Sequence, residues 1–380
     1  MKRFYKVFGL ATVSLPFIYK PAWKAFTADE SAEGVDLEHA RGFIVEDLAD
    51  MAIFSVTKER ELANDIALRF NSRLGKIQVS HEGAGHETKI QVLESIRAKR
   101  VFLICSFDTS RWSFNESLID LLLTIGTMKR SSPVEVNVVL PYYAYCRQNS
   151  PSSEHRKSIF ASDLALLLEA AGADKIFTVN LHHPAINGSF NIPVLNVDVS
   201  SLCATYFKKY KFKDLVLVCA NDRLFPQAVK IQNAFRKSGH DVDIGCLAKK
   251  SGKSQRKYDY IGKDVKGRDV LIIDNIIDTG DTTLEASNCL NDLGAKDVYM
   301  FGVHGILSGS AVEKINNSNI KELVFTNTMP LHMAKLSPKI NTISVASMLA
   351  ETIAQSTFNK TLSQIKEEGG IKALHSNLDI

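Results

Sequence analysis

The sequence predicts an α/β protein with two similar domains, each a mostly parallel sheet flanked by helices. Two observations carry this prediction. Short apolar runs alternate along the chain with longer segments in which apolar residues recur at helical spacing. Such alternation is typical of parallel sheets that helices cover on both faces. In addition, 380 residues, 45% of them hydrophobic, give room for two ordinary domains.

The first segment of the chain differs from the rest. Residues 1–27 contain basic residues and no acidic one, and their apolar stretch over 7–19 is interrupted by Pro16. This stretch is shorter than the roughly 20 residues of a membrane-spanning helix. We interpret residues 1–37 as an organelle presequence or as an anchor to a membrane or partner, with a disordered tail as the third possibility. A presequence predicts a mitochondrial location, and the alternative is cytoplasmic.

The charge of the body excludes one class of partner. The formal net charge is +4, but residues 1–27 hold five of the 46 basic residues, which leaves 41 basic against 42 acidic residues, or −1. The body therefore has no basic excess that would indicate nucleic-acid binding. The six cysteines lie far apart and form no CxxC pair. We interpret them as reduced core thiols, which indicates a reducing compartment.

The N-terminal domain is expected over residues 38–198. The expected helices cover 58–74, 114–129 and 161–171, and the expected strands cover 101–105, 136–140 and 176–179. Gly75 and Gly172 are expected to end the first and last of these helices.

The C-terminal domain is expected over residues 199–357, because NVDVSS at 196–201 separates two stretches of similar pattern. The expected strands cover 215–219, 242–246, 270–273, 298–303 and 323–326, and the expected helices cover 202–209, 227–237 and 346–355. The remaining tail, 358–380, is polar and is expected to be mobile.

One stretch, DVLIIDNIIDTGDTTLEASNCL at 269–290, combines a strand, a loop and the start of a helix. An apolar run over 270–273 precedes an acidic, hydroxylated and glycine-bearing segment over 274–281, and helical spacing begins at Thr282. In such a unit, loop N–H groups and the helix N-terminus bind anions, and carboxylates at the strand end hold sugar hydroxyls or a metal. The stretch predicts a site for a phosphorylated sugar.

Several stretches in the same order resemble the ribose-phosphate diphosphokinases, also called phosphoribosyl-diphosphate synthetases. They are HETKIQVLESIR (86–97), PYYAYCRQ (141–148), AGADKIFTVNLHHPAINGSFNIP (171–193), the loop stretch, HGILSG (304–309) and TNTMP (326–330). The resemblance implies two domains of the type I phosphoribosyltransferase fold. It also implies transfer of a diphosphoryl group from ATP to C1 of ribose 5-phosphate with Mg²⁺, usually in hexamers.

The resemblance assigns ribose-phosphate binding to the loop residues Asp274, Asp278, Thr279, Gly280 and Thr282. The family has Asp at 275 and Gly at 281, where this chain has Asn275 and Asp281. A carboxylate at 281 would repel a phosphate dianion by about 3 kcal/mol per pair of unit charges at about 5 Å. We expect Asp281 to block the site, with Asp281 or Thr282 as the N-cap and Thr282 and Glu285 as a capping box. In the alternative, Asp281 points to solvent and the loop still binds.

Arg147 and Gln148 match the pair that contacts ATP in the family. Glu87 matches the glutamate of the adenine-binding loop, whose aromatic residue and amide are replaced by Gly83 and Gly85. The loss of a stacked aromatic weakens ATP binding without abolishing it.

The metal and catalytic positions are altered. His182 matches a family histidine near the metal, although a structural histidine is the alternative, and Asn180 stands where the family has Asp. An amide does not supply the anionic oxygen that Mg²⁺ favours. Lys249 and Lys250 are weak replacements for the two cations of the catalytic loop, since Ala248 stands where its Lys is expected and Lys250 lacks the bidentate geometry of Arg.

These substitutions predict a diphosphokinase-like protein with impaired catalysis, which acts as a regulatory or structural subunit. The alternative is an active ribose-phosphate diphosphokinase that uses Mg²⁺ and makes phosphoribosyl diphosphate for nucleotide synthesis. A simple phosphoribosyltransferase is a third reading. The expected partners are related subunits, in a homo- or hetero-oligomer, or a larger mitochondrial assembly.

Overall fold

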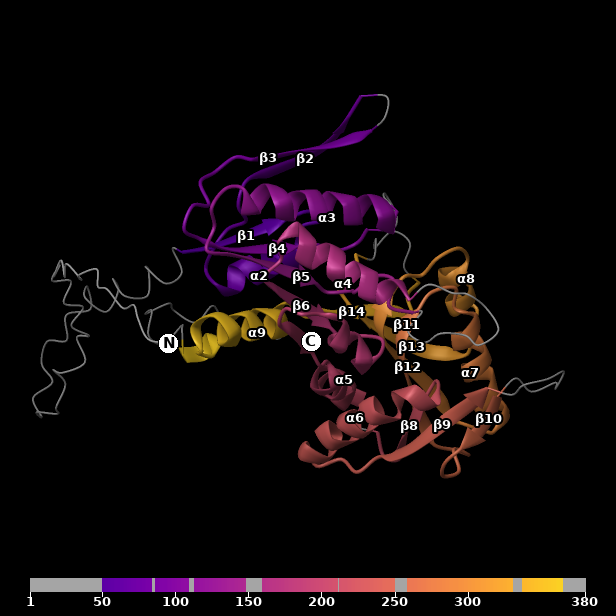
Figure 1. The fold of residues 1–380 in the computed structure, drawn as a ribbon. Coiled ribbons are helices and arrows are strands. Elements are labelled where there is room, and N and C mark those ends of the chain that lie inside the picture. The colour runs from indigo at the N-terminus through magenta and orange to yellow at the C-terminus, as the bar shows by residue number, and fades with distance from the viewer. Residues whose placement is uncertain are drawn as a thin grey trace, which may run out of the picture.

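The computed structural model has two halves, each formed around one sheet (Figure 1). The structure describes residues 50–83, 86–108, 113–147, 159–210, 212–249, 258–330 and 337–364. The expected presequence or anchor and the start of the first expected domain lie outside these residues, as does the tail beyond residue 364.

The N-terminal half contains a five-stranded sheet of order β1-β4-β5-β6-β7, in which all neighbours are parallel. Its strands are β1 (Met51–Ser55), β4 (Arg100–Ile104), β5 (Glu135–Leu140), β6 (Lys175–Val179) and β7 (Val194–Val197). Its helices are α2 (Glu61–Arg69), α3 (Phe114–Lys129), α4 (Phe160–Ala171) and the short η1 (Pro184–Ser189). A separate hairpin of β2 (Ile77–Glu82) and β3 (Glu87–Val92) projects from this half (Figure 1).

The C-terminal half contains a seven-stranded sheet of order β10-β9-β8-β11-β12-β13-β14. Its strands are β8 (Leu215–Cys219), β9 (Asp243–Lys249), β10 (Tyr258–Ile261), β11 (Asp269–Ile277), β12 (Asp297–Gly305), β13 (Ile320–Thr326) and β14 (Ile340–Ile343). Within this described sheet, only β10 runs antiparallel to its neighbour. The helices that follow the first half are α5 (Ser200–Phe207), α6 (Phe225–Lys237), α7 (Asp281–Asp292), α8 (Ala311–Asn316) and α9 (Ala346–Phe358), with the short turns η2 (Lys208–Tyr210) and η3 (Asp222–Leu224).

The parallel α/β architecture expected from the sequence is confirmed. One helix is shorter than expected, because α2 ends at Arg69, after which Asn71 takes a left-handed φ of 51°. The chain then turns back, and the N–H of Gly75 donates to the carbonyl of Ile53 at 2.7 Å. Gly75 thus does not end the helix. A Cβ there would lie 2.3 Å from Cε1 of Phe54, so only glycine fits beside that ring.

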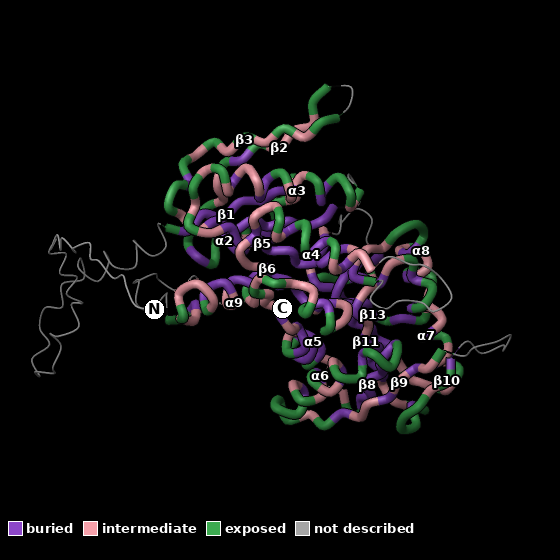
Figure 2. Tube along the Cα trace, viewed as in Figure 1, coloured by how far each residue is buried: buried purple, intermediate pink, exposed green. Residues whose placement is uncertain are grey.

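The two halves share one core. Figure 2 shows the inner strands of both sheets as largely buried segments, and one hydrophobic cluster contains residues of both halves. Helix α9, which was expected in the second domain, packs against α2 and β7 of the N-terminal half and buries Leu349 and Ile353 there. Four of the cysteines are buried, and Cys246 and Cys289 are half-buried. Across the described residues, no helix is both long and apolar enough to span a membrane.

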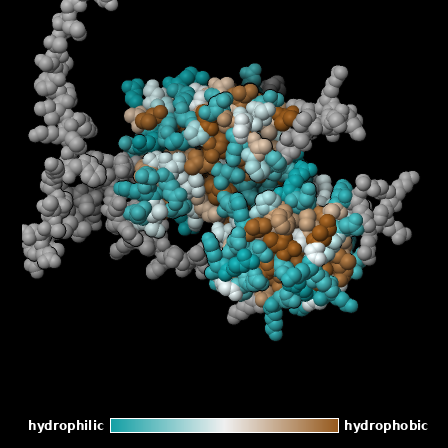
Figure 3. Space-filling view, turned by 60° about the horizontal axis from the view of Figure 1, so that its bottom comes forward, coloured by the Kyte–Doolittle hydropathy of each residue, from teal (hydrophilic) through white to brown (hydrophobic). Residues whose placement is uncertain are grey.

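Apolar side chains also reach the surface. Figure 3 shows apolar patches between polar side chains on both halves of the face it displays. Large exposed apolar residues include Ile119 and Leu123 on α3, Leu166 and Leu167 on α4, and Ile261 on β10. Exposed apolar patches often mark protein contacts. The oligomer expected from the sequence stays a prediction, and these positions are candidates for its interface.

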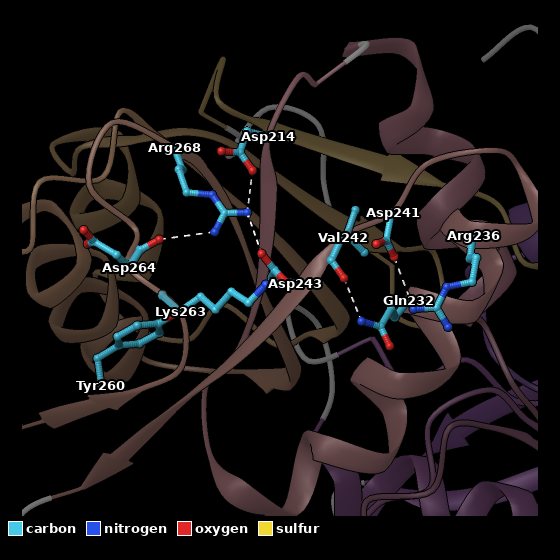
Figure 4. A network of polar contacts seen from close by, with 10 residues as sticks. All are labelled: Asp214, Gln232, Arg236, Asp241, Val242, Asp243, Tyr260, Lys263, Asp264 and Arg268. Carbon is cyan, nitrogen blue, oxygen red and sulfur yellow. Dashed lines mark hydrogen bonds and ion pairs between the residues drawn. The ribbon is translucent and has the colours of Figure 1, made fainter.

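A polar network lies at the end of the C-terminal sheet where the strands β8, β9 and β11 begin (Figure 4). The largely buried guanidinium of Arg268 has Nη2 2.5 Å from Asp214 and 2.9 Å from Asp243. Nζ of Lys263 lies 3.0 Å from Asp243. The network therefore fixes one end of the β9–β10 ribbon, and the other end of β9 carries Lys249.

We expect Arg268→Met to lower the free energy of unfolding by about 1–2 kcal/mol, because it leaves two carboxylates without their shared cation. Lys263→Met is the matched control. The Lys263 side chain is 72% exposed, so its loss is expected to change stability by less than about 0.5 kcal/mol. Urea unfolding of both variants measures the difference. Equal losses would contradict the assignment of Arg268 as the anchor.

Candidate functional site

The loop expected to bind a sugar phosphate lies between β11 and α7. Strand β11 continues to Ile277 in register with β12, so the loop consists of Asp278, Thr279 and Gly280. Gly280 is the N-cap of α7 and has a left-handed φ of 77°, which suits glycine. The N-terminal turn of α7 leaves backbone N–H groups without partners inside the helix. The loop therefore has the geometry of an anion site.

Asp281 is not the N-cap, and the capping box expected at Thr282 and Glu285 is also wrong. Because Gly280 takes the left-handed conformation, α7 begins at Asp281, and Thr282 is already the second helical residue. The Asp281 side chain is 60% exposed, and its Oδ1 lies 2.6 Å from Nζ of Lys314. Its Oδ2 accepts a hydrogen bond from Oγ1 of Thr279 at 3.0 Å. Whether Asp281 blocks phosphate stays a prediction.

Asp278 connects the loop to the N-terminal half. Its Oδ2 lies 2.6 Å from Nη1 of Arg147, and the hydroxyl of Ser308 donates to its Oδ1. Burial raises the pKa of Asp278, but the hydrogen bond from Ser308 and the charge of Arg147 together lower this pKa below its usual value. The structure thus places Arg147, which was expected to contact ATP, directly against the ribose-phosphate loop.

Asp274 lies inside β11, four residues before Asp278. Its carboxyl is only partly exposed, and the backbone N–H of Asn275 donates to Oδ1 at 2.8 Å. Loss of water around the carboxyl raises the pKa of Asp274 to about 7, although the backbone N–H groups of Asn275 and Ile276 act to lower it. The carboxyl is therefore partly protonated at neutral pH.

The two asparagines that replace family acids lie at the junction of the halves. Nδ2 of the buried Asn275 donates to the carbonyl of Asn180 at 3.3 Å, and Oδ1 of Asn180 accepts from the N–H of Val199 at 3.2 Å. His304 has Nε2 3.4 Å from the same carbonyl and Nδ1 2.8 Å from Oγ1 of Thr328. Burial lowers the pKa of His304 to about 3, so the ring is neutral. Both amides have structural roles here.

Reinstating the family acid at position 275 is expected to destabilise the chain. Asn275→Asp would set a carboxylate against the Asn180 carbonyl and lower the free energy of unfolding at pH 7 by about 1–3 kcal/mol. The loss should fall to about 0.5 kcal/mol near pH 4, where the new carboxyl is protonated in the folded state and about half protonated in the unfolded state. Urea unfolding at the two pH values checks this. Asn288→Asp, on the exposed face of α7, is the control and is expected to have little effect.

His182 lies half-buried beyond β6. Its Nδ1 is buried and has no hydrogen-bond partner among the described residues. Burial lowers the pKa of His182, and the nearby charges of Arg223 and Arg147 lower it further. Arg223 lies in η3, directly after β8, and sequence reasoning missed it. The only signal was its place after the carboxyl end of a parallel strand, where ligands commonly bind.

The remaining predicted residues are not gathered at the loop. Glu87 is exposed near the tip of the β2–β3 hairpin, which projects away from the C-terminal half (Figure 1). Lys249 is exposed at the end of β9, opposite Tyr258. Gln148 and Lys250 lie outside the described residues.

The described residues form no group of three or more His, Cys, Asp or Glu side chains placed to hold a metal. Three carboxylates lie at or beside the loop: Asp281 is paired with Lys314, Asp278 faces Arg147, and Asp274 has no ion pair among the described residues. Mg²⁺ commonly binds through one or two carboxylates together with substrate phosphates. These residues therefore fit a Mg²⁺ ion that arrives with a phosphate, rather than one held by the protein alone.

The two parallel sheets and the strand–loop–helix site define a protein of the type I phosphoribosyltransferase fold. A family model described as the N-terminal domain of ribose phosphate pyrophosphokinase matches residues 51–172. A second, described as a phosphoribosyl synthetase-associated domain, matches residues 242–366.

Relatives and a solved structure agree. The ribose-phosphate pyrophosphokinase of Oceanobacillus iheyensis is 35% identical over 307 residues, which cover 80% of this chain and 93% of that protein. The ribose-phosphate pyrophosphokinase of Corynebacterium ammoniagenes is 36% identical with the same coverage. The crystal structure of phosphoribosylpyrophosphate synthetase from Mycobacterium smegmatis matches with a TM-score of 0.73 and 29% identity, over 82% of this chain and 99% of that chain. This chain belongs to the ribose-phosphate pyrophosphokinase family.

Proposed function

We propose that this chain is an active ribose-phosphate pyrophosphokinase, which transfers a diphosphoryl group from ATP to C1 of ribose 5-phosphate. The observation that carries the proposal is the 2.6 Å ion pair between Arg147 and Asp278. A two-substrate transfer needs the ATP-binding residues beside the sugar-phosphate loop, and this pair joins them across 131 residues of sequence. The similarity to proteins named ribose-phosphate pyrophosphokinase supports the same reaction.

The proposal assigns separate tasks to the loop residues. Backbone N–H groups at Thr279 and Gly280 and at the start of α7 hold the 5-phosphate. Asp274, when ionised, accepts hydrogen bonds from the ribose hydroxyls. Arg147 neutralises charge on the transferred phosphates. Mg²⁺ bound with ATP would supply further charge neutralisation, with Asp278 as the carboxylate nearest to the transfer.

The sequence favoured a catalytically impaired protein over an active enzyme, and the proposal reverses that preference. That expectation rested on substitutions at the metal, adenine, catalytic-loop and phosphate positions. Asp281 was the most telling of them, and it does not cap α7, whose N-cap is Gly280. A second candidate, a catalytically impaired regulatory or structural subunit, is favoured by the amides at Asn180 and Asn275, whose side chains serve the junction between the halves.

One assay separates the two candidates. The purified chain is incubated with ATP, Mg²⁺ and ribose 5-phosphate, and phosphoribosyl diphosphate is measured through a coupled phosphoribosyltransferase. The expected result is steady product formation that depends on all three components. If calorimetry shows ribose 5-phosphate bound but no product forms, the second candidate replaces the first.

We also propose that the protein assembles with copies of itself or with related subunits, and that residues 1–37 direct it to mitochondria. Its apolar surface positions and the absence of acids from residues 1–27 support these proposals. The mass of the complex that purifies with the native protein tests the first. Import into isolated mitochondria followed by N-terminal sequencing tests the second, since removal of the segment is expected.

A further inference from the structure

We propose that Lys314 holds the carboxylate of Asp281 toward α8 and away from a bound phosphate, so that the loop stays an anion site although the chain has a carboxylate where the family has glycine. The two residues would then act as one compensating pair. This inference rests on the proposed binding of ribose 5-phosphate, and it adds a residue that no motif identifies. Asp281 alone, at about 5 Å from a phosphate charge, would weaken binding about 100-fold or more.

The geometry shows that Asp281 is held toward α8. Nζ of Lys314 lies 2.6 Å from Oδ1 of Asp281 and donates to the carbonyl of Thr279 at 3.3 Å. Oδ2 of Asp281 accepts from the hydroxyl of Thr279 at 3.0 Å. Both carboxylate oxygens therefore have donors, and the lysine contacts the loop at two residues.

Helix α8 is fixed beside the loop, which places Lys314 accurately. Ala311 and Ile315 are fully buried, so one face of this short helix is anchored in the core. Backbone N–H groups of the preceding segment donate to the loop, from Ile306 to Ile277 at 2.9 Å and from Ser308 to Asp278 at 3.1 Å.

The ammonium is restrained on the loop side and still meets solvent. The Lys314 side chain is 32% exposed. A pair of this exposure adds little to stability on its own. Its contribution is therefore expected to appear in ligand affinity, where the loop would otherwise carry an unopposed negative charge.

A lysine beside a phosphate loop has a second possible role, in which it contacts the phosphate directly. The two roles predict different double-mutant cycles. If Lys314 only holds Asp281 away from the phosphate, removing the carboxylate makes the lysine dispensable. If Lys314 binds phosphate itself, its loss weakens binding whether or not Asp281 is present.

The experiment measures ribose 5-phosphate affinity by calorimetry on the full chain and three variants. Lys314→Met is expected to raise Kd by about 10- to 100-fold. Asp281→Asn, which keeps the size and hydrogen-bonding atoms of the side chain, is expected to change Kd by less than about threefold. In the double variant, Kd should stay within about threefold of that of Asp281→Asn.

Lys321→Met is the matched control, since Lys321 pairs with Asp297 at 3.2 Å on the same half and is 58% exposed. Circular dichroism confirms that each variant is folded. An unchanged Kd for Lys314→Met overturns the inference. So does a loss that persists in the double variant, or a gain above about tenfold for Asp281→Asn, which would mean that Asp281 blocks the site uncompensated.

The outcomes also separate this inference from the proposed function. If the cycle shows the expected coupling but no phosphoribosyl diphosphate is made, only the catalytic proposal fails. If product forms and the effects of the two substitutions on Kd are additive, only the inference fails. If the unmodified chain does not bind ribose 5-phosphate at millimolar concentration, both fail.

Discussion

Arg147→Met is expected to lower kcat/KM for phosphoribosyl diphosphate synthesis by about 10²- to 10³-fold, because it removes a cation from the transferred phosphates. Arg147 lies 2.6 Å from Asp278 and is 44% exposed, so it is available to an incoming phosphate. Arg147→Lys keeps the charge but loses the bidentate fork, and an intermediate loss of about tenfold or more is expected. The coupled assay measures both variants.

The loss of activity in Arg147→Met should not come from unfolding. A half-exposed ion pair contributes about 1 kcal/mol or less, so the midpoint of thermal unfolding is expected to move only slightly. Arg130→Met is the control, because Arg130 is exposed at the end of α3, before β5 begins, whereas Arg147 follows the carboxyl end of β5. Activity of Arg147→Met within threefold of the unmodified chain would remove Arg147 from the reaction.

Strongly periodic segments were predicted correctly. The helix expected over 114–129 was found with those bounds as α3, because Ser113 and Glu116 form a capping box that fixes its start. The hairpin of β2 and β3 was missed, since its side chains are mostly exposed or half-buried and its apolar alternation is too short to identify a strand, with two apolar residues in each. The short strands β10 and β14 were missed for the same reason.

Strand β11 is longer than its apolar run. Asp274 and Ile276 continue the ladder with β12, opposite Gly302 and His304, so polar residues occupy strand positions that apolar patterning does not identify. Pairing with β12 therefore extends β11 beyond the residues whose local apolar pattern predicts a strand.

The candidate site could be located from the sequence, but not all of its residues could be identified. The loop and Arg147 were found because a motif surrounds each of them. Lys314 was missed, since it meets the loop from 33 residues further along the chain, outside any motif. Ser308 lies in HGILSG (304–309), but that motif assigned it no contact with Asp278, which is 30 residues earlier in the chain. The expected role of Asp281 as a cap failed because a left-handed Gly280 lets the helix begin without a side-chain cap.

Asp274→Asn is expected to raise the free energy of unfolding at pH 8 by on the order of 2–4 kcal/mol. The pKa of Asp274 is raised to about 7 in the folded chain, against about 3.9 in an unfolded one. Below pH 4 the carboxyl is protonated in both states, and the substitution changes little. As the pH rises toward 7, the unfolded state loses this proton more readily than the folded state, so the unmodified chain loses stability that the variant keeps.

Urea unfolding between pH 4 and pH 8 measures this difference. Asp278→Asn is a control of opposite sign, since the pKa of Asp278 is lowered in the folded chain. It is expected to destabilise the chain at pH 7, and this effect should fade as the pH falls through the folded pKa. If the stability of Asp274→Asn follows that of the unmodified chain at every pH, the raised pKa of Asp274 is refuted.

Asp274 lowers the stability of the folded chain when its carboxyl is ionised. A carboxyl with this property indicates a ligand that favours the ionised form. Ribose hydroxyls donate hydrogen bonds to a carboxylate, so ribose 5-phosphate should bind the ionised Asp274 and lower its pKa. Binding at pH 6.5 is therefore expected to release part of a proton, which calorimetry in buffers of different ionisation enthalpy detects. Asp274→Asn should reduce that release to the part that comes from the phosphate, whose second pKa is about 6, and should weaken binding. Equal proton release from the variant would place the titrating group elsewhere and exclude Asp274 as the sugar ligand.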